Sequence, residues 1–256
     1  MLLAMDVGNT NIKVGLFENG SLLHSWRMTS NRHVTADELG IQMESFFQHL
    51  SIPTEAVDGI VMSSVIPSMN YTIEHMFSIY FSALKPLMVD SSLKLGFVNG
   101  YEHPATLGSD RICNAVATLN LYGGPAITID FGTATNFIVL SKDARFIGGV
   151  ICPGFQISTD ALIEHAEMLH KVEYIKPPKL ICTNTERSIQ AGIIYGYVGQ
   201  IEYLIKRLKR EIGAPCRVIA TGGMSSLIAS ETDSIDVLNR TLTLEGLRMI
   251  YDMNKG

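Results

Sequence analysis

Two short turns in this chain combine a carboxylate, a glycine and a hydroxyl in nearly the same order. The first is Asp6-Val7-Gly8-Asn9-Thr10-Asn11, and the second is Asp130-Phe131-Gly132-Thr133-Ala134-Thr135. Successive backbone N–H groups in such a turn form a concave anion site. Glycine lets the backbone approach a ligand closely and allows a positive φ. The pair of turns therefore predicts a site that grips a polyphosphate from both sides.

Each turn also supplies a carboxylate, Asp6 or Asp130. A carboxylate repels a phosphate unless a cation lies between them. The pair therefore predicts a metal ion, most naturally Mg²⁺ held largely through water. The residues alone leave it open whether Asp130 holds Mg²⁺ or K⁺. A single turn of this kind is also an ordinary turn, and it is the repetition that favours the functional interpretation.

Rival motifs are absent from the sequence. There is no Gly-Lys dipeptide, so there is no Walker A loop, and no two glycines are separated by one residue, which excludes a GxGxxG motif. Neither HExxH nor GxSxG occurs. His165 and His170 are five positions apart, which places them on different faces of a helix, so we interpret them as surface histidines.

Apolar runs place both turns between strands, and the same arrangement occurs twice. Asn19-Gly20 is typical of a hairpin turn after the first pair of strands. Each half thus opens with a strand, a glycine turn, a second strand, a hairpin and a third strand. The expected strands are 2–5, 12–17, 21–28, 126–129, 136–140 and 145–151.

The rest of each half adds helices and a strand that ends in small residues. The strands are 59–65 and 217–223, and apolar spacing predicts helices over 35–50 and 201–212. The basic run 206–210 is interpreted as a solvated helix face. We therefore predict two α/β halves, 1–107 and 108–256, with the ligand in a central cleft where the turns face each other.

Composition limits the class of protein. The chain has 256 residues, 46% of them hydrophobic and 18% charged, and a net charge of −5. Its 22 glycines and 9 prolines fit a compact fold with tight turns. The length predicts one or two domains. The acidic balance argues against a nucleic-acid-binding protein, which usually carries a basic footprint.

The sequence shows no pattern typical of a targeting signal or a membrane-spanning segment. No apolar run reaches the roughly 18 residues needed to cross a bilayer, and Asp6 interrupts the apolar start with no basic residue before it. The four cysteines are widely spaced without a CxxC pair. This pattern predicts reduced thiols and a cytoplasmic protein that does not bind membranes.

Taken together, these features resemble type III pantothenate kinases, within the actin–hexokinase–Hsp70 superfamily of ribonuclease-H-like folds. The resemblance covers essentially the whole chain, and the Gly-x-Asp-Arg element distinguishes this family from actins and sugar kinases. Cys152 is one mild departure. Besides the two turns, the matching segments are Gly108-Ser109-Asp110-Arg111, 148–154, Thr185 before 191–193, and Thr221-Gly222-Gly223.

The resemblance implies a duplicated ribonuclease-H-like (actin-like ATPase) fold and a reaction. That reaction is the ATP-dependent phosphorylation of pantothenate to 4′-phosphopantothenate, the first step of coenzyme A biosynthesis. It further implies Mg²⁺, a monovalent cation (K⁺ or NH₄⁺) and a homodimer.

It also implies roles for individual residues. Asp110 would accept the hydroxyl proton, and Asp130 would bind the monovalent cation. Residues 221–223 would lie near the adenosine. ATP would be bound by Asp6, Val7, Gly8, Asn9, Thr10, Asn11, Ile12, Lys13 and Thr133. Pantothenate would be bound by Tyr101, Gly108, Ser109, Asp110, Arg111 and Thr185.

Chemistry allows these roles and leaves structural alternatives open. A carboxylate of ordinary pKa is a weak base, so Asp110 would take the proton late. Arg111 suits a bidentate grip on a carboxylate. Ser109 or Asp110 could instead cap a helix over 111–121. Likewise, Tyr101 could be rim packing, and Thr185 could cap a helix that begins near Glu186.

Two alternative functions also stay open at this point. One is a non-catalytic nucleotide-binding regulator on the same fold, and the other is a different small-molecule kinase of the superfamily. ATP binding without phosphorylation of any alcohol favours the first. A panel of acceptors distinguishes the second.

Overall fold

The computed structural model describes residues 1–82 and 84–255, and the chain forms two compact units. Unit 1 is Met1–Ala117 with Thr241–Gly256, and unit 2 is Thr118–Arg240. Both are mixed α/β units built around one sheet each. In the described part of the chain, no helix combines the length and apolar character needed to cross a bilayer.

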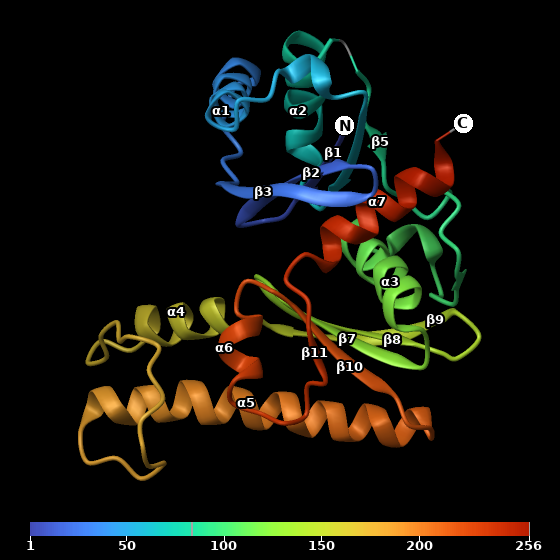
Figure 1. The fold of residues 1–256 in the computed structure, drawn as a ribbon. Coiled ribbons are helices and arrows are strands. Elements are labelled where there is room, and N and C mark those ends of the chain that lie inside the picture. The colour runs from blue at the N-terminus through green and yellow to red at the C-terminus, as the bar shows by residue number, and fades with distance from the viewer. Residues whose placement is uncertain (83, 256) are drawn as a thin grey trace. The chain divides into compact units, whose positions relative to one another are not determined.

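The sheet of unit 1 follows the predicted strand order closely. Its first three strands form an antiparallel meander, and the fourth returns parallel to the first (Figure 1). The spatial order is β3-β2-β1-β4-β5. The strands are β1 (Leu2–Val7), β2 (Asn11–Glu18), β3 (Ser21–Thr29), β4 (Gly59–Ser64) and β5 (Leu87–Met88).

The hairpin between β2 and β3 confirms the Asn-Gly signal. Asn19 and Gly20 have φ values of 49° and 80°. Positive φ at both central residues matches the right-handed twist of the flanking strands, and asparagine and glycine tolerate it best.

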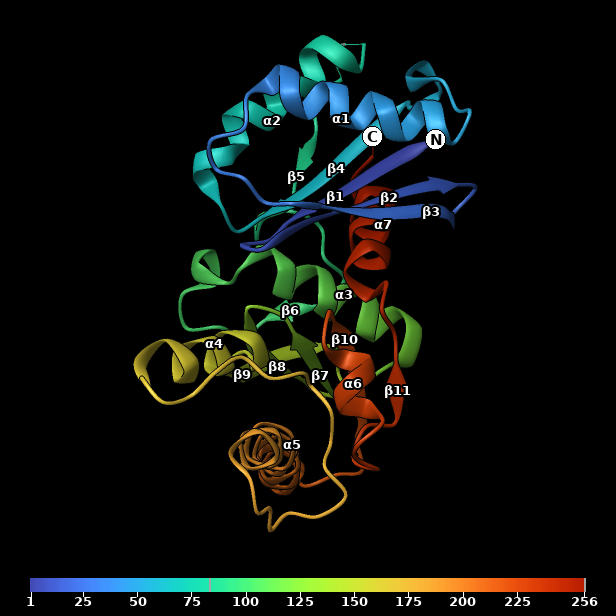
Figure 2. The ribbon, with the colours of Figure 1, turned by 90° about the vertical axis from the view of Figure 1, so that its left-hand side faces the viewer.

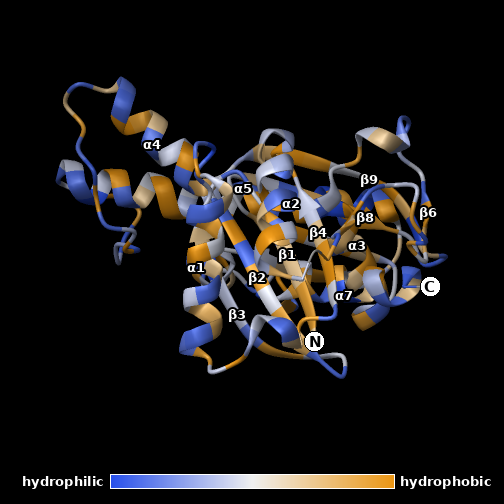
Figure 3. Cartoon of the chain, turned by 90° about the horizontal axis from the view of Figure 1, so that it is seen from above, coloured by the Kyte–Doolittle hydropathy of each residue, from blue (hydrophilic) through white to orange (hydrophobic). Residues whose placement is uncertain are grey.

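Helices cover both faces of this sheet. α1 (Ala36–His49) and α2 (Pro67–Tyr80) lie on one face, and α7 (Leu242–Asn254) lies on the other (Figures 1 and 2). Unit 1 also contains the start of α3 (Ser109–Tyr122), the short strand β6 (Val98–Asn99) and the 3₁₀ turns Thr54–Ala56 and Pro104–Thr106. β1 is hydrophobic along most of its length, as expected of a central strand with both faces covered (Figure 3).

Unit 2 repeats the same topology. Its strands lie in the order β11-β10-β7-β8-β9, with an antiparallel β7-β8-β9 meander and parallel β7-β10-β11 pairing. Thus β7 corresponds to β1 and β10 to β4, which confirms the predicted duplication. The strands are β7 (Ala126–Phe131), β8 (Ala134–Leu140), β9 (Arg145–Pro153), β10 (Arg217–Gly222) and β11 (Val237–Leu238).

The helices of unit 2 are α4 (Phe155–His165), α5 (Thr185–Ile212) and α6 (Ser225–Ala229). α5 lies along the sheet (Figure 1) and contributes Ile194, Ile201 and Ile205 to the core. It is longer than the expected 201–212. His165 ends α4 and His170 lies beyond it, and no group of three or more metal-binding side chains occurs among the described residues.

The division into units differs from the expected boundary at 107/108. The boundary lies within α3, between Ala117 and Thr118, and residues from Thr241 onward belong to unit 1. The reason is close packing of α7 within unit 1. A Cβ at Gly246 would lie 2.0 Å from the carbonyl oxygen of Cys113, so only glycine allows α7 to pack so closely against α3.

Candidate active site

The first predicted turn follows β1 in unit 1 and is held by a serine from the end of β3. The Gly8 N–H donates to the Asn11 carbonyl at 3.1 Å. The Ser30 hydroxyl donates to the Gly8 carbonyl at 2.5 Å, and the Ser30 N–H donates to the Thr10 carbonyl at 3.0 Å. The backbone of residues 6–13, the expected phosphate loop, is therefore fixed by its own strand pair and by the neighbouring strand.

The glycines of the two turns do not use the positive φ that glycine allows. Neither Gly8 nor Gly132 has a positive φ. A Cβ at Gly8 would instead lie 3.1 Å from the Asn11 carbonyl oxygen. Gly8 is thus needed for space in a narrow turn. At Gly132 the nearest atom would be 3.5 Å away, an ordinary contact.

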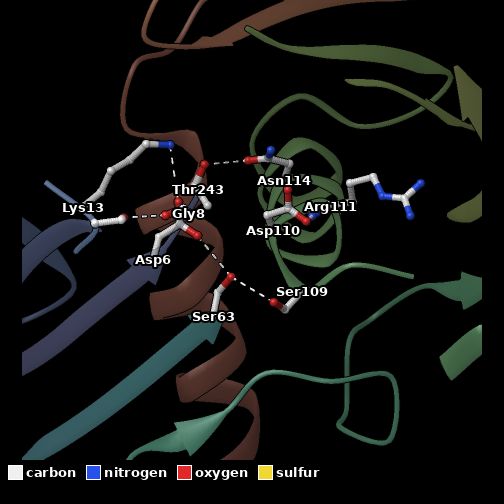
Figure 4. A network of polar contacts seen from close by, with 10 residues as sticks. Asp6, Gly8, Lys13, Ser63, Ser109, Asp110, Arg111, Asn114 and Thr243 are labelled. Atoms are coloured by element: carbon white, nitrogen blue, oxygen red, sulfur yellow. Dashed lines mark hydrogen bonds and ion pairs between the residues drawn. The ribbon is translucent and has the colours of Figure 1, made fainter. Parts of the chain in front are cut away.

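Asp6 is the penultimate residue of β1 and is only 5% exposed. Lys13, its register partner on β2, places Nζ 3.3 Å from Oδ2. The Ser63 hydroxyl lies 3.1 Å from Oδ1 as a donor (Figure 4). A buried carboxylate is tolerated only when it is paired and hydrogen-bonded. The loop therefore presents a carboxylate and an ammonium in one fixed arrangement.

The same serine connects Asp6 to the start of α3. The hydroxyl proton of Ser63 has two possible acceptors, because Asp6 Oδ1 and Ser109 Oγ each lie 3.1 Å from Ser63 Oγ. Ser109 Oγ accepts from the Ser64 N–H and donates to the Ser64 carbonyl, both at 3.1 Å. Ser109 thus joins the end of β4 to the beginning of α3. Its role in binding substrate stays a prediction.

The Gly108-Ser109-Asp110-Arg111 segment forms the first turn of α3. The Ile112 N–H donates to the Gly108 carbonyl at 3.1 Å, so the helix is entered through Gly108, and Ser109 is not its cap. Asp110 Oδ1 accepts from the Arg111 N–H at 2.8 Å. A Cβ at Gly108 would lie 2.6 Å from Asp110 Oδ1. The Asp110 carboxylate therefore folds back over the helix N-terminus, where the helix dipole favours an anion.

The structure brings Arg111 and Tyr101 together, and their role in binding substrate stays a prediction. Arg111 Nη1 donates to the Tyr101 hydroxyl at 3.3 Å, and its Cζ lies 5.2 Å from the centre of the ring. The Arg111 side chain extends away from Asp110 (Figure 4). The stacked guanidinium keeps a planar fork that suits a carboxylate.

The second predicted turn follows β7 in unit 2. Asp130 is 7% exposed and is the register partner of Thr221 on β10. Gly222 has a φ of +95°, and a Cβ there would lie 2.5 Å from Asp130 Oδ1. The Thr221-Gly222-Gly223 turn therefore contacts the Asp130 carboxylate directly. Thr133 is exposed, and its carbonyl accepts from the Gly154 N–H at 3.0 Å.

Thr185 is the exposed first residue of α5 in unit 2. The alternative that it caps this helix is wrong. Asn184 is the cap, and its Oδ1 accepts from the Arg187 N–H at 2.9 Å. A substrate-binding role for Thr185 stays a prediction, as does a cleft in which the two Asp-Gly turns face each other.

Comparison with known proteins decides the family. The sequence profile of type III pantothenate kinases matches residues 2–207. The chain belongs to the type III pantothenate kinase family. A kinase family implies ATP as the phosphoryl donor and a small molecule as the acceptor.

Solved structures agree with this family in fold. A proposed Baf family transcriptional activator from Campylobacter jejuni is 18% identical with a TM-score of 0.62, over 99% of this chain and 98% of its own. A proposed 2-dehydro-3-deoxygalactonokinase from Sinorhizobium meliloti is 12% identical with a TM-score of 0.61, over 98% and 95%. Component A of (R)-2-hydroxyglutaryl-CoA dehydratase from Acidaminococcus fermentans is 12% identical with a TM-score of 0.54, over 96% and 94%. At these identities the likeness is one of fold.

Sequence reasoning missed three polar residues in unit 1 of this family member. Ser63 bonds to Asp6, as described above. Thr243, near the start of α7, donates its hydroxyl to Asn114 Oδ1 at 2.9 Å, and both residues are at most 2% exposed (Figure 4). Asn114 lies one turn after Asp110, so this bond ties α7 to the helix that carries Asp110. The only sequence signal for this bond was that Asn114 is a polar residue four positions after Asp110.

The buried thiol of Cys113 lies among these groups and is chemically quiet. Burial raises its pKa well above the ordinary value, and the negative charges of Asp6 and Asp110 raise it further. Since the thiolate is the nucleophilic form, Cys113 stays protonated and unreactive. All four cysteines are free, as the sequence predicts.

The surroundings of Asp130 suit a hard cation of the kind this kinase family implies. Thr221 Oγ1 is buried and has no hydrogen-bond partner among the described residues. Thr221 is the register partner of Asp130 on the neighbouring strand. Carboxylate and hydroxyl oxygens are ligands that K⁺ and Mg²⁺ accept. An orphaned buried hydroxyl costs free energy unless a ligand satisfies it.

Gly222→Ala is expected to be far more harmful than Gly223→Ala. Alanine at 222 is strained at φ +95° and collides with Asp130 Oδ1, whereas nothing lies within 4 Å of a Cβ at 223. We expect Gly222→Ala to lower the free energy of unfolding by about 1–3 kcal/mol and to weaken ATP binding. Urea denaturation and calorimetric titration with ATP measure both effects. Equal effects from the two variants would contradict this account.

Proposed function

We propose that this chain phosphorylates pantothenate with ATP to give 4′-phosphopantothenate, the first step of coenzyme A biosynthesis. The family match supports the reaction class. The observation that carries the acceptor assignment is the pair Asp110 and Arg111 at the start of α3. Their side chains extend in different directions (Figure 4), so they can hold the two ends of one acceptor, its hydroxyl and its carboxylate.

In the acceptor half of this mechanism, Asp110 receives the hydroxyl proton. Phosphoryl transfer needs mainly positioning and charge stabilisation. A carboxylate of ordinary basicity is a weak base, so the proton moves late, after the oxygen has begun to bond to phosphorus. Arg111 holds the pantothenate carboxylate, with Tyr101 fixing the guanidinium at 3.3 Å. Gly108, Ser109 and Thr185 complete the proposed acceptor site.

In the nucleotide half, the phosphate loop 6–13 and Thr133 bind ATP. Lys13, held 3.3 Å from Asp6, places a positive charge beside the loop amides. Residues 221–223 lie near the adenosine, and Asp130 binds K⁺ or NH₄⁺ with the help of Thr221. Mg²⁺, when bound with ATP, neutralises charge that develops on the transferred phosphoryl group.

Release of ADP with pantothenate, Mg²⁺ and ATP tests the function. Turnover should depend on pantothenate and should rise when K⁺ or NH₄⁺ replaces Na⁺. Asp130→Asn should remove that stimulation. Absence of pantothenate-dependent turnover in every condition would overturn the proposal. Turnover with a different alcohol would identify another small-molecule kinase, and ATP binding without turnover on any acceptor would indicate a regulator.

Arg111→Lys is expected to raise KM for pantothenate by about tenfold or more, with a smaller effect on kcat. Lysine keeps the charge but loses the planar fork that grips a carboxylate with two hydrogen bonds. Initial-rate kinetics measure the split. The matched control is an acceptor whose carboxylate is replaced by a primary alcohol. Wild-type and variant should use that acceptor equally poorly, and a difference as large as with pantothenate would contradict the assignment.

A homodimer is part of the same proposal. Unit 2 exposes apolar side chains on neighbouring elements, namely Ile147 and Ile151 on β9 and Ile157 and Leu162 on α4, all between 45% and 59% exposed. Exposed apolar groups of this kind are typical of protein–protein contacts. Light scattering during gel filtration should give twice the monomer mass of 28.1 kDa, and a monomer would overturn this part.

A further inference from the structure

One fully buried hydroxyl in unit 1 lies between the first Asp-x-Gly turn and the start of α3. Ser63 on β4 is 0% exposed and is the register partner of Asp6 on the parallel strand β1. Its Oγ is 3.1 Å from Asp6 Oδ1 and 3.1 Å from Ser109 Oγ, and the three side chains come from three different elements (Figure 4). Ser109 directly precedes Asp110, the proposed base. The Ser63 hydroxyl therefore links a residue of the proposed nucleotide half to the start of the proposed acceptor half.

The Ser63 hydroxyl has one proton, so it donates to one of these two acceptors at a time. In the first arrangement it donates to Asp6 Oδ1. In the second it donates to Ser109 Oγ, which also accepts from the Ser64 N–H and donates to the Ser64 carbonyl, both at 3.1 Å. A hydroxyl has one proton and two lone pairs. The second arrangement therefore uses the whole hydrogen-bonding capacity of Ser109 and holds the start of α3 most firmly.

The charge near Asp6 decides which arrangement is favoured. An ionised carboxylate is a stronger acceptor than a hydroxyl, so Asp6, whose Oδ2 lies 3.3 Å from Lys13 Nζ, keeps the bond from Ser63 in the free protein. The buried Cys113 thiol also lies within hydrogen-bonding reach of Ser63, but sulfur is a weak acceptor and does not compete with a carboxylate. A positive group that engages Asp6 Oδ1 weakens this acceptor, and the hydroxyl then turns to Ser109.

We propose that Ser63 is a positioning residue that couples nucleotide binding to the order of the helix start that carries Asp110. Positive charge that arrives at Asp6 with the nucleotide turns the Ser63 hydroxyl toward Ser109, and Ser109 then fixes the neighbouring Asp110. Coupling of two sites needs an element with two arrangements whose balance both sites influence, and this hydroxyl is such an element. The inference rests on the proposed function, because the roles of Asp6 and Asp110 come from there.

Hydrogen exchange tests the coupling without any acceptor. Addition of Mg²⁺ and the β,γ-imido analogue of ATP should slow amide exchange several-fold in peptides that cover residues 109–116 of the wild-type protein. Ser63→Ala should still bind the analogue but lose most of this protection, and Ser63→Thr, which keeps the hydroxyl, should retain it. If Ser63→Ala does not fold, Ser63→Cys, a weaker donor of similar shape, gives the same comparison. No protection in wild-type, or equal protection in wild-type and Ser63→Ala, would overturn the proposal.

The matched control is Thr118→Val, which also removes one buried hydroxyl. Thr118 lies further along α3, and its Oγ1 is 2.6 Å from Thr128 Oγ1, with both residues fully buried. A buried hydroxyl that loses its partner is costly, so this variant and Ser63→Ala should both be less stable than wild-type in urea. Only Ser63→Ala should lose the exchange effect. The same loss in Thr118→Val would assign the effect to general destabilisation and contradict a positioning role.

Kinetics and titration calorimetry give the second readout. Ser63→Ala should lower kcat about tenfold with little change in KM for ATP, since a hydrogen bond to a charged group is lost. In wild-type the analogue should tighten pantothenate binding several-fold, and pantothenate should tighten the analogue by the same factor, because coupling between two sites is reciprocal. Ser63→Ala should abolish this mutual effect. Absence of pantothenate turnover in wild-type would overturn the proposed function, and the exchange measurement would still decide the role of Ser63. Normal turnover with unchanged coupling in Ser63→Ala would overturn this inference alone.

Discussion

Asp110→Asn should lower kcat by about 10²–10⁴-fold, the usual contribution of a positioned general base. Asparagine is nearly isosteric, and its Oδ1 can still accept the Arg111 N–H, which lies 2.8 Å away in the native protein. The helix start should therefore stay folded, and only the proton acceptor is lost. Steady-state ADP release gives kcat, and calorimetric titration should show nearly unchanged ATP affinity.

The control for this result is Glu102→Gln, which neutralises an exposed carboxylate in the loop before α3. It should leave kcat close to that of wild-type. If Asp110→Asn turned over at a near-normal rate, Asp110 would be excluded as the base. If instead ATP affinity fell together with kcat, Asp110 would belong to the nucleotide site.

Among glycine-to-alanine substitutions in unit 1, Gly246→Ala should be the most destabilising. It should lower the free energy of unfolding by about 3 kcal/mol or more. Its Cβ would lie 2.0 Å from the Cys113 carbonyl oxygen, and backbone atoms cannot rotate aside. α7 and α3 must then separate, which also strains the Thr243–Asn114 bond of 2.9 Å one turn from Asp110. We expect kcat to fall even at temperatures where the variant is folded.

Gly199→Ala is the matched control, because it adds the same methyl in the exposed middle of α5 with nothing within 4 Å. It should raise the free energy of unfolding by up to about 1 kcal/mol, since alanine has the higher helix propensity. Urea denaturation of both variants tests the pair. Similar stability in the two would show that α7 does not depend on close approach at Gly246.

Local pattern was enough to predict most elements of this fold. Alternating apolar residues and Asn19-Gly20 specify the β2–β3 hairpin, because register and turn geometry depend on neighbours in sequence. The repeated Asp-x-Gly turns likewise predicted a duplicated topology, and both units have the same strand order. The contact between Arg111 and Tyr101 was not predicted, although the two residues are only ten positions apart and the resemblance assigns both to the acceptor site.

Other features depend on contacts between distant residues. Ser63 bonds to Asp6 across two parallel strands, and Thr243 bonds to Asn114, which lies 129 positions earlier in the chain, so neither bond leaves a local sequence pattern. Gly8 has no positive φ, and it is the nearby Asn11 carbonyl oxygen, not a left-handed turn, that favours glycine there.

The sequence by itself determined the two Asp-x-Gly turns, the Gly-Ser-Asp-Arg helix start and the duplicated α/β halves, since each depends on adjacent or periodic residues. Only the tertiary structure decided that α7 belongs to unit 1 and that Asp6 is buried against Lys13 and Ser63. The physical reason is that burial, close helix packing and cavity shape are set by which elements meet, and that choice minimises the free energy of the whole chain rather than of any segment.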